Sequence, residues 1–207
     1  MTSSKISGLY VVTDTTVQSK YSHTELAEMA LKGGAKVIQV RDKQLDATEL
    51  MQTGNKIREM CDDFDATFII NDRIDIAFAT NSHGVHLGQK DLPISVGRSI
   101  LGENKIIGGT ASEVSDAIAV EKNDADYVGF GHIYPTKTKS KKYEPRGLST
   151  LKQVKDSISI PVVAIGGINR DNAHEVVEAR ADSIAVSSAV CAADEPVKAS
   201  EFLAGLF

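Results

Sequence analysis

The chain has 207 residues, a formal net charge of −5 and 42% hydrophobic residues, which fits a single globular domain over residues 1–207. The negative charge argues against nucleic acid or an anionic membrane surface as the main partner, and the absence of Trp removes a common base-stacking group. No long apolar run or signal-peptide pattern is present. Cys61 and Cys191 fit two buried thiols in a reducing compartment, so we expect a cytoplasmic protein.

Eight short runs rich in Val and Ile predict β-strands along the whole chain. They span residues 9–13, 37–41, 67–71, 84–87, 105–109, 127–131, 161–165 and 183–187. Helical patterns lie between them, at residues 22–33, from 46 onward, and at 112–122, 169–179 and 195–206. This alternation predicts an α/β fold, a single (β/α)8 TIM barrel, with a doubly wound open sheet as the competing fold. In such a barrel the active site lies at the C-terminal ends of the strands.

The end of the second predicted strand carries cationic side chains. Gln39, Arg41 and Lys43 share one parity, whereas Ile38 and Val40 share the other. If Ile38 and Val40 face the helices, Gln39 and Arg41 point into the barrel and Lys43 lies at its rim. A cation in a barrel mouth is costly unless an anion meets it, so this pattern predicts an anionic ligand. The alternative is an ion pair between Arg41 and a carboxylate at a neighbouring strand end.

Two carboxylates follow the third and fourth predicted strands. Asp72 comes directly after Asn71, and Asp91 follows the turn after the fourth strand. Oxygen ligands from adjacent strands, with room for water and phosphate oxygens, suit Mg²⁺. The alternative for each residue is to cap the helix that follows. Together with Arg41 and Lys43, the pair favours a bound metal–diphosphate.

The loop after the sixth predicted strand offers two hydroxyl groups and two ammonium groups within residues 135–139, P-T-K-T-K. Its place at a strand end favours phosphate contact and closure over the site, although a solvated basic loop is the alternative. A second phosphate site is predicted where Gly166-Gly167 ends the seventh strand and Ser187-Ser188 the eighth, because the corresponding loops of these barrels often bind phosphate.

Taken together, these motifs resemble the thiamine-phosphate synthase (thiamine-phosphate pyrophosphorylase) family. The resemblance covers residues 9–190 and rests on the order and spacing of L-Y-V-V-T-D, Q-V-R-D-K, I-N-D, V-H-L-G-Q-K-D-L, P-T-K-T-K, A-I-G-G-I and V-S-S-A. It implies a transferase that joins a hydroxymethylpyrimidine diphosphate to a thiazole phosphate and releases diphosphate. It also implies small phosphorylated substrates as partners and one Mg²⁺ per subunit, and it leaves a homo-oligomer open.

The resemblance assigns roles residue by residue. The pyrimidine diphosphate would be held by Gln39, Val40, Arg41, Asp42, Lys43, Asn71, Thr110 and Lys139. The thiazole phosphate would be held by Thr136, Lys137, Thr138, Gly167, Ser187 and Ser188, and Mg²⁺ by Asp72 and Asp91. The catalytic residues would be Arg41, Lys43, Lys139 and Thr110, where Thr110 replaces the usual Ser.

The residue types agree with such a reaction, because cations and a metal neutralise the charge of a leaving diphosphate. A dissociative path through a pyrimidine carbocation needs no protein nucleophile. His132 leaves a thiazole tautomerase of the same superfamily as one alternative, since that relative has a histidine there to move a proton. A non-catalytic binder of phosphorylated thiamine precursors is another. We interpret His132 as strand-end structure or a minor site contact, and His86 as a barrel-core histidine.

Overall fold

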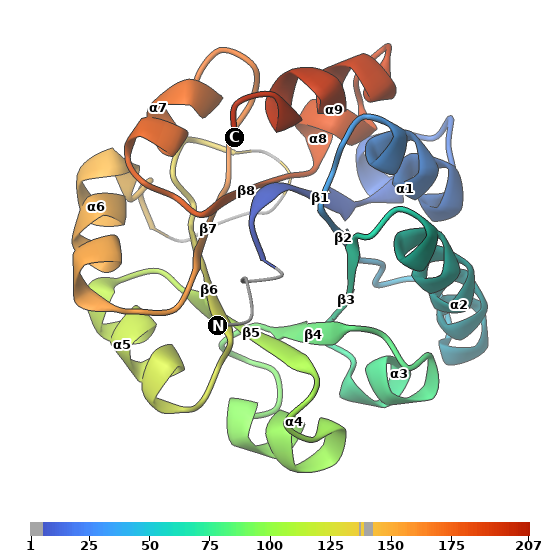
Figure 1. Cartoon of the computed structure of the whole chain (residues 1–207), viewed down its shortest axis with the longest axis horizontal. Coiled ribbons are helices and arrows are strands. Elements are labelled where there is room, and N and C mark those ends of the chain that lie inside the picture. Colours follow the sequence, from blue (N-terminus) through green and yellow to red (C-terminus); the bar gives the residue numbers. More distant parts are fainter. Residues whose placement is uncertain (1–5, 137, 139–142) are drawn as a thin grey trace.

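A computed structural model describes residues 6–136, 138 and 143–207, and all structural statements below concern these residues. Eight parallel strands pair in chain order and close into a barrel, which confirms the predicted (β/α)8 architecture (Figure 1). The strands are β1 (Gly8–Thr13), β2 (Val37–Val40), β3 (Thr67–Asn71), β4 (Gly84–Leu87), β5 (Ile106–Ala111), β6 (Tyr127–Gly131), β7 (Val162–Ile165) and β8 (Ser183–Val186).

Helices follow the strands and surround the barrel (Figure 1). They are η1 (Thr15–Val17), α1 (His23–Lys32), α2 (Ala47–Asp63), α3 (Ile74–Ala79), α4 (Ile94–Leu101), α5 (Val114–Lys122), α6 (Gly147–Ser157), α7 (Ala173–Glu178), α8 (Ser188–Cys191) and α9 (Pro196–Ala204). The first two long helices begin with capping boxes, Ser22 with Glu25 and Asp46 with Glu49, which satisfy backbone N–H groups of the first turn. Among the described residues, no helix is both long enough and apolar enough to cross a membrane.

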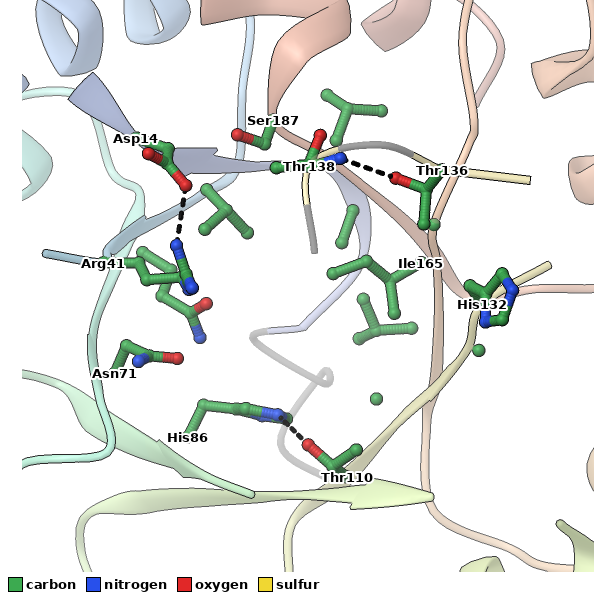
Figure 2. A pocket seen from close by; sticks show the side chains of 18 of the residues that line it. Asp14, Arg41, Asn71, His86, Thr110, His132, Thr136, Thr138, Ile165 and Ser187 are labelled. Carbon is green, nitrogen blue, oxygen red and sulfur yellow. Dashed lines mark hydrogen bonds and ion pairs between the residues drawn. The ribbon is translucent and has the colours of Figure 1, made fainter. Parts of the chain in front are cut away.

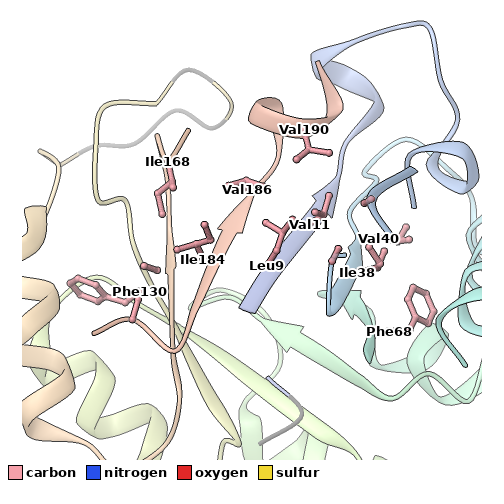
Figure 3. Close-up of a cluster of buried hydrophobic side chains, with 14 of the residues drawn as sticks. Leu9, Val11, Ile38, Val40, Phe68, Phe130, Ile168, Ile184, Val186 and Val190 are labelled. Carbon is pink, nitrogen blue, oxygen red and sulfur yellow. The ribbon is translucent and has the colours of Figure 1, made fainter. Parts of the chain in front are cut away.

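The hydrophobic core has two layers, one on each face of the barrel wall. Ile38, Val40 and Phe68 belong to the outer layer, between the strands and the helices (Figure 3). Tyr10 and Ile69 belong to the inner layer, inside the barrel. Successive residues of a strand point to opposite faces, so the outward position of Ile38 and Val40 turns the intervening side chain inward, as their parity predicts.

Candidate active site

A cavity of about 1050 Å³ opens at the C-terminal ends of the strands (Figure 2). Every strand contributes to its wall, either directly or through the loop that follows it. Most of the predicted site residues line this one cavity: Gln39, Arg41, Lys43, Asn71, Asp72, Asp91, Thr110, Thr136, Thr138, Gly167, Ser187 and Ser188. Residues up to about 150 positions apart in the chain therefore meet at one barrel mouth, as parallel strands require.

Arg41 lies in the cavity and is paired with a carboxylate there. Its guanidinium donates to Asp14, which follows β1, across 2.7 Å (Figure 2). The Asp14 side chain is only 2% exposed, whereas that of Arg41 is 21% exposed. The other Asp14 oxygen accepts the backbone N–H of Thr16, which fixes the carboxylate. Arg41 thus combines both interpretations of its sequence position: it reaches the cavity, and it pairs with a neighbouring strand-end carboxylate.

Neither Asp72 nor Asp91 is the N-cap residue of the helix that follows it. The N-cap residues of α3 and α4 are Arg73 and Pro93, and their side chains make no cap hydrogen bond. The Asp91 carboxylate instead accepts the backbone N–H of Gly88 across 2.7 Å, which holds it at the end of β4.

The donor set at these two strand ends fits Mg²⁺. Asp72 and Asp91 line the same cavity from the ends of adjacent strands, and Asn71 lines it too. Within the described ranges, no group of three or more His, Cys, Asp or Glu gathers as a metal-binding cluster. Two carboxylates without further protein ligands suit an ion that keeps several waters and binds substrate phosphates.

The opposite side of the mouth is built from small and hydroxylated residues. Gly166 and Gly167 adopt positive φ angles of 102° and 71°. A Cβ at Gly167 would lie 2.5 Å from the carbonyl oxygen of Pro135, so only glycine lets the end of β7 approach the loop after β6 this closely. The Ser187 hydroxyl, after β8, is buried in the cavity wall beside the Cys191 thiol. A buried hydroxyl in a cavity wall is suited to bind an incoming oxygen ligand.

Thr136 and Thr138, from the loop after β6, line the cavity. The backbone N–H of Thr138 donates to the Thr136 hydroxyl across 3.3 Å (Figure 2). Lys137 and Lys139, which we predicted as phosphate ligands, lie outside the described residues.

Comparison with known proteins identifies the family. A family model described as thiamine monophosphate synthase matches residues 9–190, which is most of the chain. The chain belongs to the thiamine monophosphate synthase family. It is 44% identical over 199 residues to a thiamine-phosphate synthase of Methanospirillum hungatei, covering 96% of this chain and 97% of that protein. A thiamine-phosphate synthase of Clostridium novyi is also 44% identical, over 198 residues, with 96% and 97% covered.

A solved structure supports the same membership in the thiamine monophosphate synthase family. The thiamine phosphate pyrophosphorylase of Pyrococcus furiosus superposes with a TM-score of 0.90 at 40% identity, over 98% of this chain and 96% of that one. Fold, motif order and family model therefore agree.

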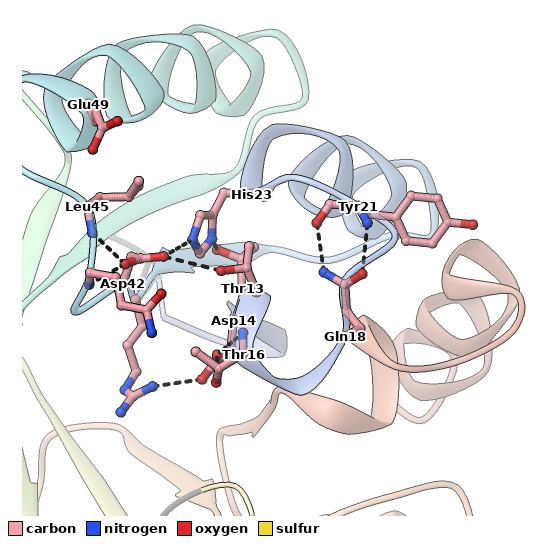
Figure 4. Close-up of polar contacts among 12 residues, drawn as sticks. Thr13, Asp14, Thr16, Gln18, Tyr21, His23, Asp42, Leu45 and Glu49 are labelled. Carbon is pink, nitrogen blue, oxygen red and sulfur yellow. Dashed lines mark hydrogen bonds and ion pairs between the residues drawn. The ribbon is translucent and has the colours of Figure 1, made fainter.

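Two residues assigned through the likeness to the thiamine monophosphate synthase family do not bring their side chains to the cavity. Val40 is 1% exposed and packs in the outer core. The Asp42 carboxylate turns toward α1, where it accepts from His23 Nε2 across 2.9 Å and from the Thr15 hydroxyl across 3.2 Å (Figure 4). Burial raises the pKa of Asp42, but hydrogen bonds from His23 and from the backbone of the loop outweigh it and lower the pKa to about 2.

Several residues that line the cavity were not predicted from the sequence. Asp14 follows β1 in the T-D of L-Y-V-V-T-D, and its place at a strand end was the available signal. Tyr10, Tyr127 and His86 also line the cavity, from inside the barrel. His132, whose role the sequence left open, is 5% exposed and lies in the wall with its ring near that of Tyr143, at a centroid distance of 5.2 Å.

Proposed function

We propose that this single-domain protein is a transferase of thiamine biosynthesis. It would condense 4-amino-2-methyl-5-hydroxymethylpyrimidine diphosphate with 4-methyl-5-hydroxyethylthiazole phosphate to give thiamine phosphate and diphosphate. The observation that carries the proposal is the division of one cavity into a charged half with Arg41, Asp72 and Asp91 and a hydroxyl-and-glycine half with Gly167 and Ser187. Two phosphorylated substrates need two such anion sites, and membership in the thiamine monophosphate synthase family gives the chemistry.

The pyrimidine diphosphate would bind in the charged half. Its support is the cavity position of the side chains that we expect to hold it, Gln39, Arg41, Lys43, Asn71 and Thr110. Lys139 remains a prediction for the same group. Val40 and Asp42 would contribute only through their backbone, because their side chains lie elsewhere.

The thiazole phosphate would bind in the other half. Thr136, Thr138, Gly167, Ser187 and Ser188 offer hydroxyl and backbone N–H groups there, and Lys137 remains a predicted ligand. The buried Ser187 hydroxyl in the cavity wall is the strongest support, since it can donate to a bound phosphate oxygen.

One Mg²⁺ per subunit would be held by Asp72 and Asp91. When bound, the ion would neutralise charge on the diphosphate and help align it. Arg41 and Lys43 would stabilise the same charge from β2, and Lys139 from the loop after β6.

The reaction itself would need no protein nucleophile. The bond between the pyrimidine methylene and the diphosphate oxygen breaks, the diphosphate carries away the electron pair, and the thiazole nitrogen then bonds to the methylene carbon. Neither cysteine is placed for covalent catalysis, because burial raises the pKa of Cys61 to about 12 and of Cys191 to about 11. Charge stabilisation and positioning by this chain's residues would supply the rate enhancement.

The test is incubation of the purified protein with both substrates and Mg²⁺. Thiamine phosphate and diphosphate should form in equal amounts. Arg41→Met should lower kcat/KM by about a hundredfold, because it removes a charged contact that strengthens as diphosphate leaves. Arg73→Met is the matched control, since the Arg73–Asp75 pair is exposed. A correctly folded wild-type sample that forms no product would refute the proposal.

The proposal also includes a cellular location and an oligomeric state. A cytoplasmic location suits Cys61 and Cys191, which are buried free thiols. A homo-oligomer would cover Phe78, Leu92 and Ile100, three exposed apolar residues around a small cavity beside α3 and α4. Sedimentation of the wild type and of Phe78→Asp tests this, because a monomer in both samples would contradict a second copy on this face.

A further inference from the structure

A chain of hydrogen-bonded side chains crosses the interior of the barrel beneath the cavity. The Gln39 amide donates to the Tyr10 hydroxyl across 3.1 Å, and Tyr10 contacts the Tyr127 hydroxyl across 3.0 Å. Tyr127 reaches His86 Nδ1 across 3.0 Å, and His86 Nε2 reaches the Thr110 hydroxyl across 2.8 Å (Figure 2). The two ends of the chain are residues that we assign to the pyrimidine diphosphate.

The barrel makes room for the rings of this chain. A Cβ at Gly108 would lie 2.1 Å from the Tyr127 ring, and a Cβ at Gly129 would lie 2.8 Å from His86. Tyr10 and Tyr127 are 2% and 1% exposed and lie among apolar residues of the inner core. Polar groups in such surroundings are costly unless each finds a partner, so the hydrogen bonds must form one consistent set.

The donor at one end determines the direction of every other hydrogen bond. The Gln39 N–H donates to the Tyr10 oxygen, so the Tyr10 proton must be donated to Tyr127. Tyr127 then donates to His86 Nδ1, which leaves Nε2 to carry the ring proton and donate to Thr110. Reversing a link would leave a buried phenol proton without an acceptor. Burial raises the pKa of Tyr10 and of Tyr127, so both phenols keep their protons.

We propose that Tyr10, Tyr127 and His86 are positioning residues that set the hydrogen-bond polarity of the cavity. Because the side-chain N–H of Gln39 donates to Tyr10, the side-chain carbonyl oxygen of Gln39 remains available to accept from a ligand. Because the Thr110 oxygen accepts from His86, its O–H remains to donate. This inference rests on the proposed function and deepens it.

The polarity selects a heterocycle by its pattern of donors and acceptors. An aminopyrimidine offers an amino N–H to the Gln39 carbonyl and a ring nitrogen to the Thr110 hydroxyl. The 4-oxo analogue presents a carbonyl and a ring N–H in those places, so an acceptor faces an acceptor and a donor faces a donor. The wild type should therefore bind the 4-oxo pyrimidine diphosphate at least about a hundredfold more weakly than the 4-amino compound, since buried polar groups are left unpaired.

The first experiment measures which His86 ring nitrogen carries the proton, and it does not depend on catalysis. In protein labelled with ¹⁵N in its histidine rings, we expect His86 to carry its proton on Nε2, with Nδ1 unprotonated, and His86→Gln assigns the signals. Tyr127→Phe should abolish the Nδ1 shift that reports acceptance of a hydrogen bond. A proton on Nδ1 in the wild type would overturn the proposed polarity. This readout stands even if the wild type makes no thiamine phosphate, so it separates failure of this inference from failure of the proposed function.

The second experiment is a double-mutant cycle. Tyr127→Phe should lower kcat/KM for the pyrimidine diphosphate by about tenfold, the worth of one misdirected hydrogen bond, and leave KM for the thiazole phosphate unchanged. In a Thr110→Ala background, the same change should cost clearly less than in the wild type, because one of the two groups that it directs is gone. Tyr21→Phe, a tyrosine outside the cavity, is the control. Equal losses in both backgrounds would show a merely structural role and overturn the proposal.

Discussion

Arg41, paired with Asp14, serves both the stability of the folded protein and anion binding. The pair places a cation in the cavity and compensates its charge with a nearly buried carboxylate. A guanidinium has five donors, so Arg41 retains N–H groups for an anion while it stays paired. An incoming diphosphate therefore meets a group that is already oriented, and little side-chain entropy remains to be lost.

Replacing Asp14 should destabilise the protein, because Arg41 would keep its charge without a partner. We expect Asp14→Ala to lower the free energy of unfolding by about 2–4 kcal/mol, measured by urea denaturation. Asp75→Ala, which breaks the exposed pair with Arg73, should cost less than about 1 kcal/mol. Inorganic diphosphate should restore part of the Asp14→Ala loss, because it would neutralise Arg41. Equal effects of the two substitutions would contradict this account of the pair.

Replacing Asp91 should change the response to metal and leave the fold intact. Asp91→Ala removes one of two proposed oxygen ligands, so the Mg²⁺ concentration for half-maximal activity should rise by at least about tenfold. Turnover at saturating Mg²⁺ should fall as well. The control is Asp63→Ala, at the exposed end of α2. An unchanged Mg²⁺ titration would exclude Asp91 as a ligand.

At the scale of elements, the loop between β2 and α2 is anchored to α1 through Asp42. The carboxylate is bound by His23 and by the backbone N–H groups of Gln44 and Leu45 (Figure 4). His23 also contacts the Thr13 hydroxyl across 2.8 Å, which ties the anchor to the end of β1. This anchor positions the loop that carries Arg41 and Lys43.

Because of this anchor, the free energy of unfolding should depend on pH in the acid range. The pKa of Asp42 is lowered to about 2 in the folded protein, below its usual value, so its contribution is present above about pH 4 and is lost as pH falls toward 2. Asp42→Asn should remove about 2 kcal/mol at neutral pH and flatten the pH dependence of unfolding between pH 4 and 2. His23→Gln should flatten it too, because it removes a hydrogen bond that lowers the pKa of Asp42. An unchanged slope in both variants would refute this.

The strands were predictable because continuous Val and Ile runs occur wherever both faces of a parallel sheet are covered. Residues 67–71, 84–87 and 127–131 match β3, β4 and β6 in both bounds. No helical range was predicted for α3, α4, α6 or α8. None of these four helices has a side-chain hydrogen bond from its N-cap residue, and α3, α4 and α8 span eight residues or fewer, too few for a clear helical period.

The site was predictable in part, for a similar reason. Parity alone turns Gln39 and Arg41 inward, and the motifs locate the carboxylates. The partner of Arg41 and the turn of Asp42 toward His23 depend on contacts between segments that are distant in the chain, such as the register that sets Thr13 beside Val40. No local pattern encodes such contacts.

On the scale of the whole molecule, the ring of helices closes where α9 packs against α1 (Figure 1). A Cβ at Gly33 would lie 2.4 Å from the Ser200 Cβ and 2.6 Å from the Val197 carbonyl oxygen. Close packing at this seam therefore depends on a residue without a side chain, far from the cavity.

Gly33→Ala should loosen this seam without altering the chemistry. We expect a loss of about 1–3 kcal/mol in the free energy of unfolding, because α9 must shift to admit the methyl group. The kcat of the folded variant should match the wild type. Gly205→Ala is the control, since the nearest atom to its added Cβ is 3.3 Å away. A wild-type stability for Gly33→Ala would contradict the close contact.

The pairing of β1 with β8 also sets the order of events during synthesis. The Ser183 hydroxyl donates to the Gly8 carbonyl across 2.8 Å, a contact between residues 175 positions apart. Local helices and early strands can form as the chain emerges from the ribosome, but long-range pairings are slow and come last. The edge of β1 that pairs with β8 therefore stays unpaired until nearly the whole chain has been translated. A mouth that draws on both strands is complete only then, so a nascent chain released before β8 should have no substrate site.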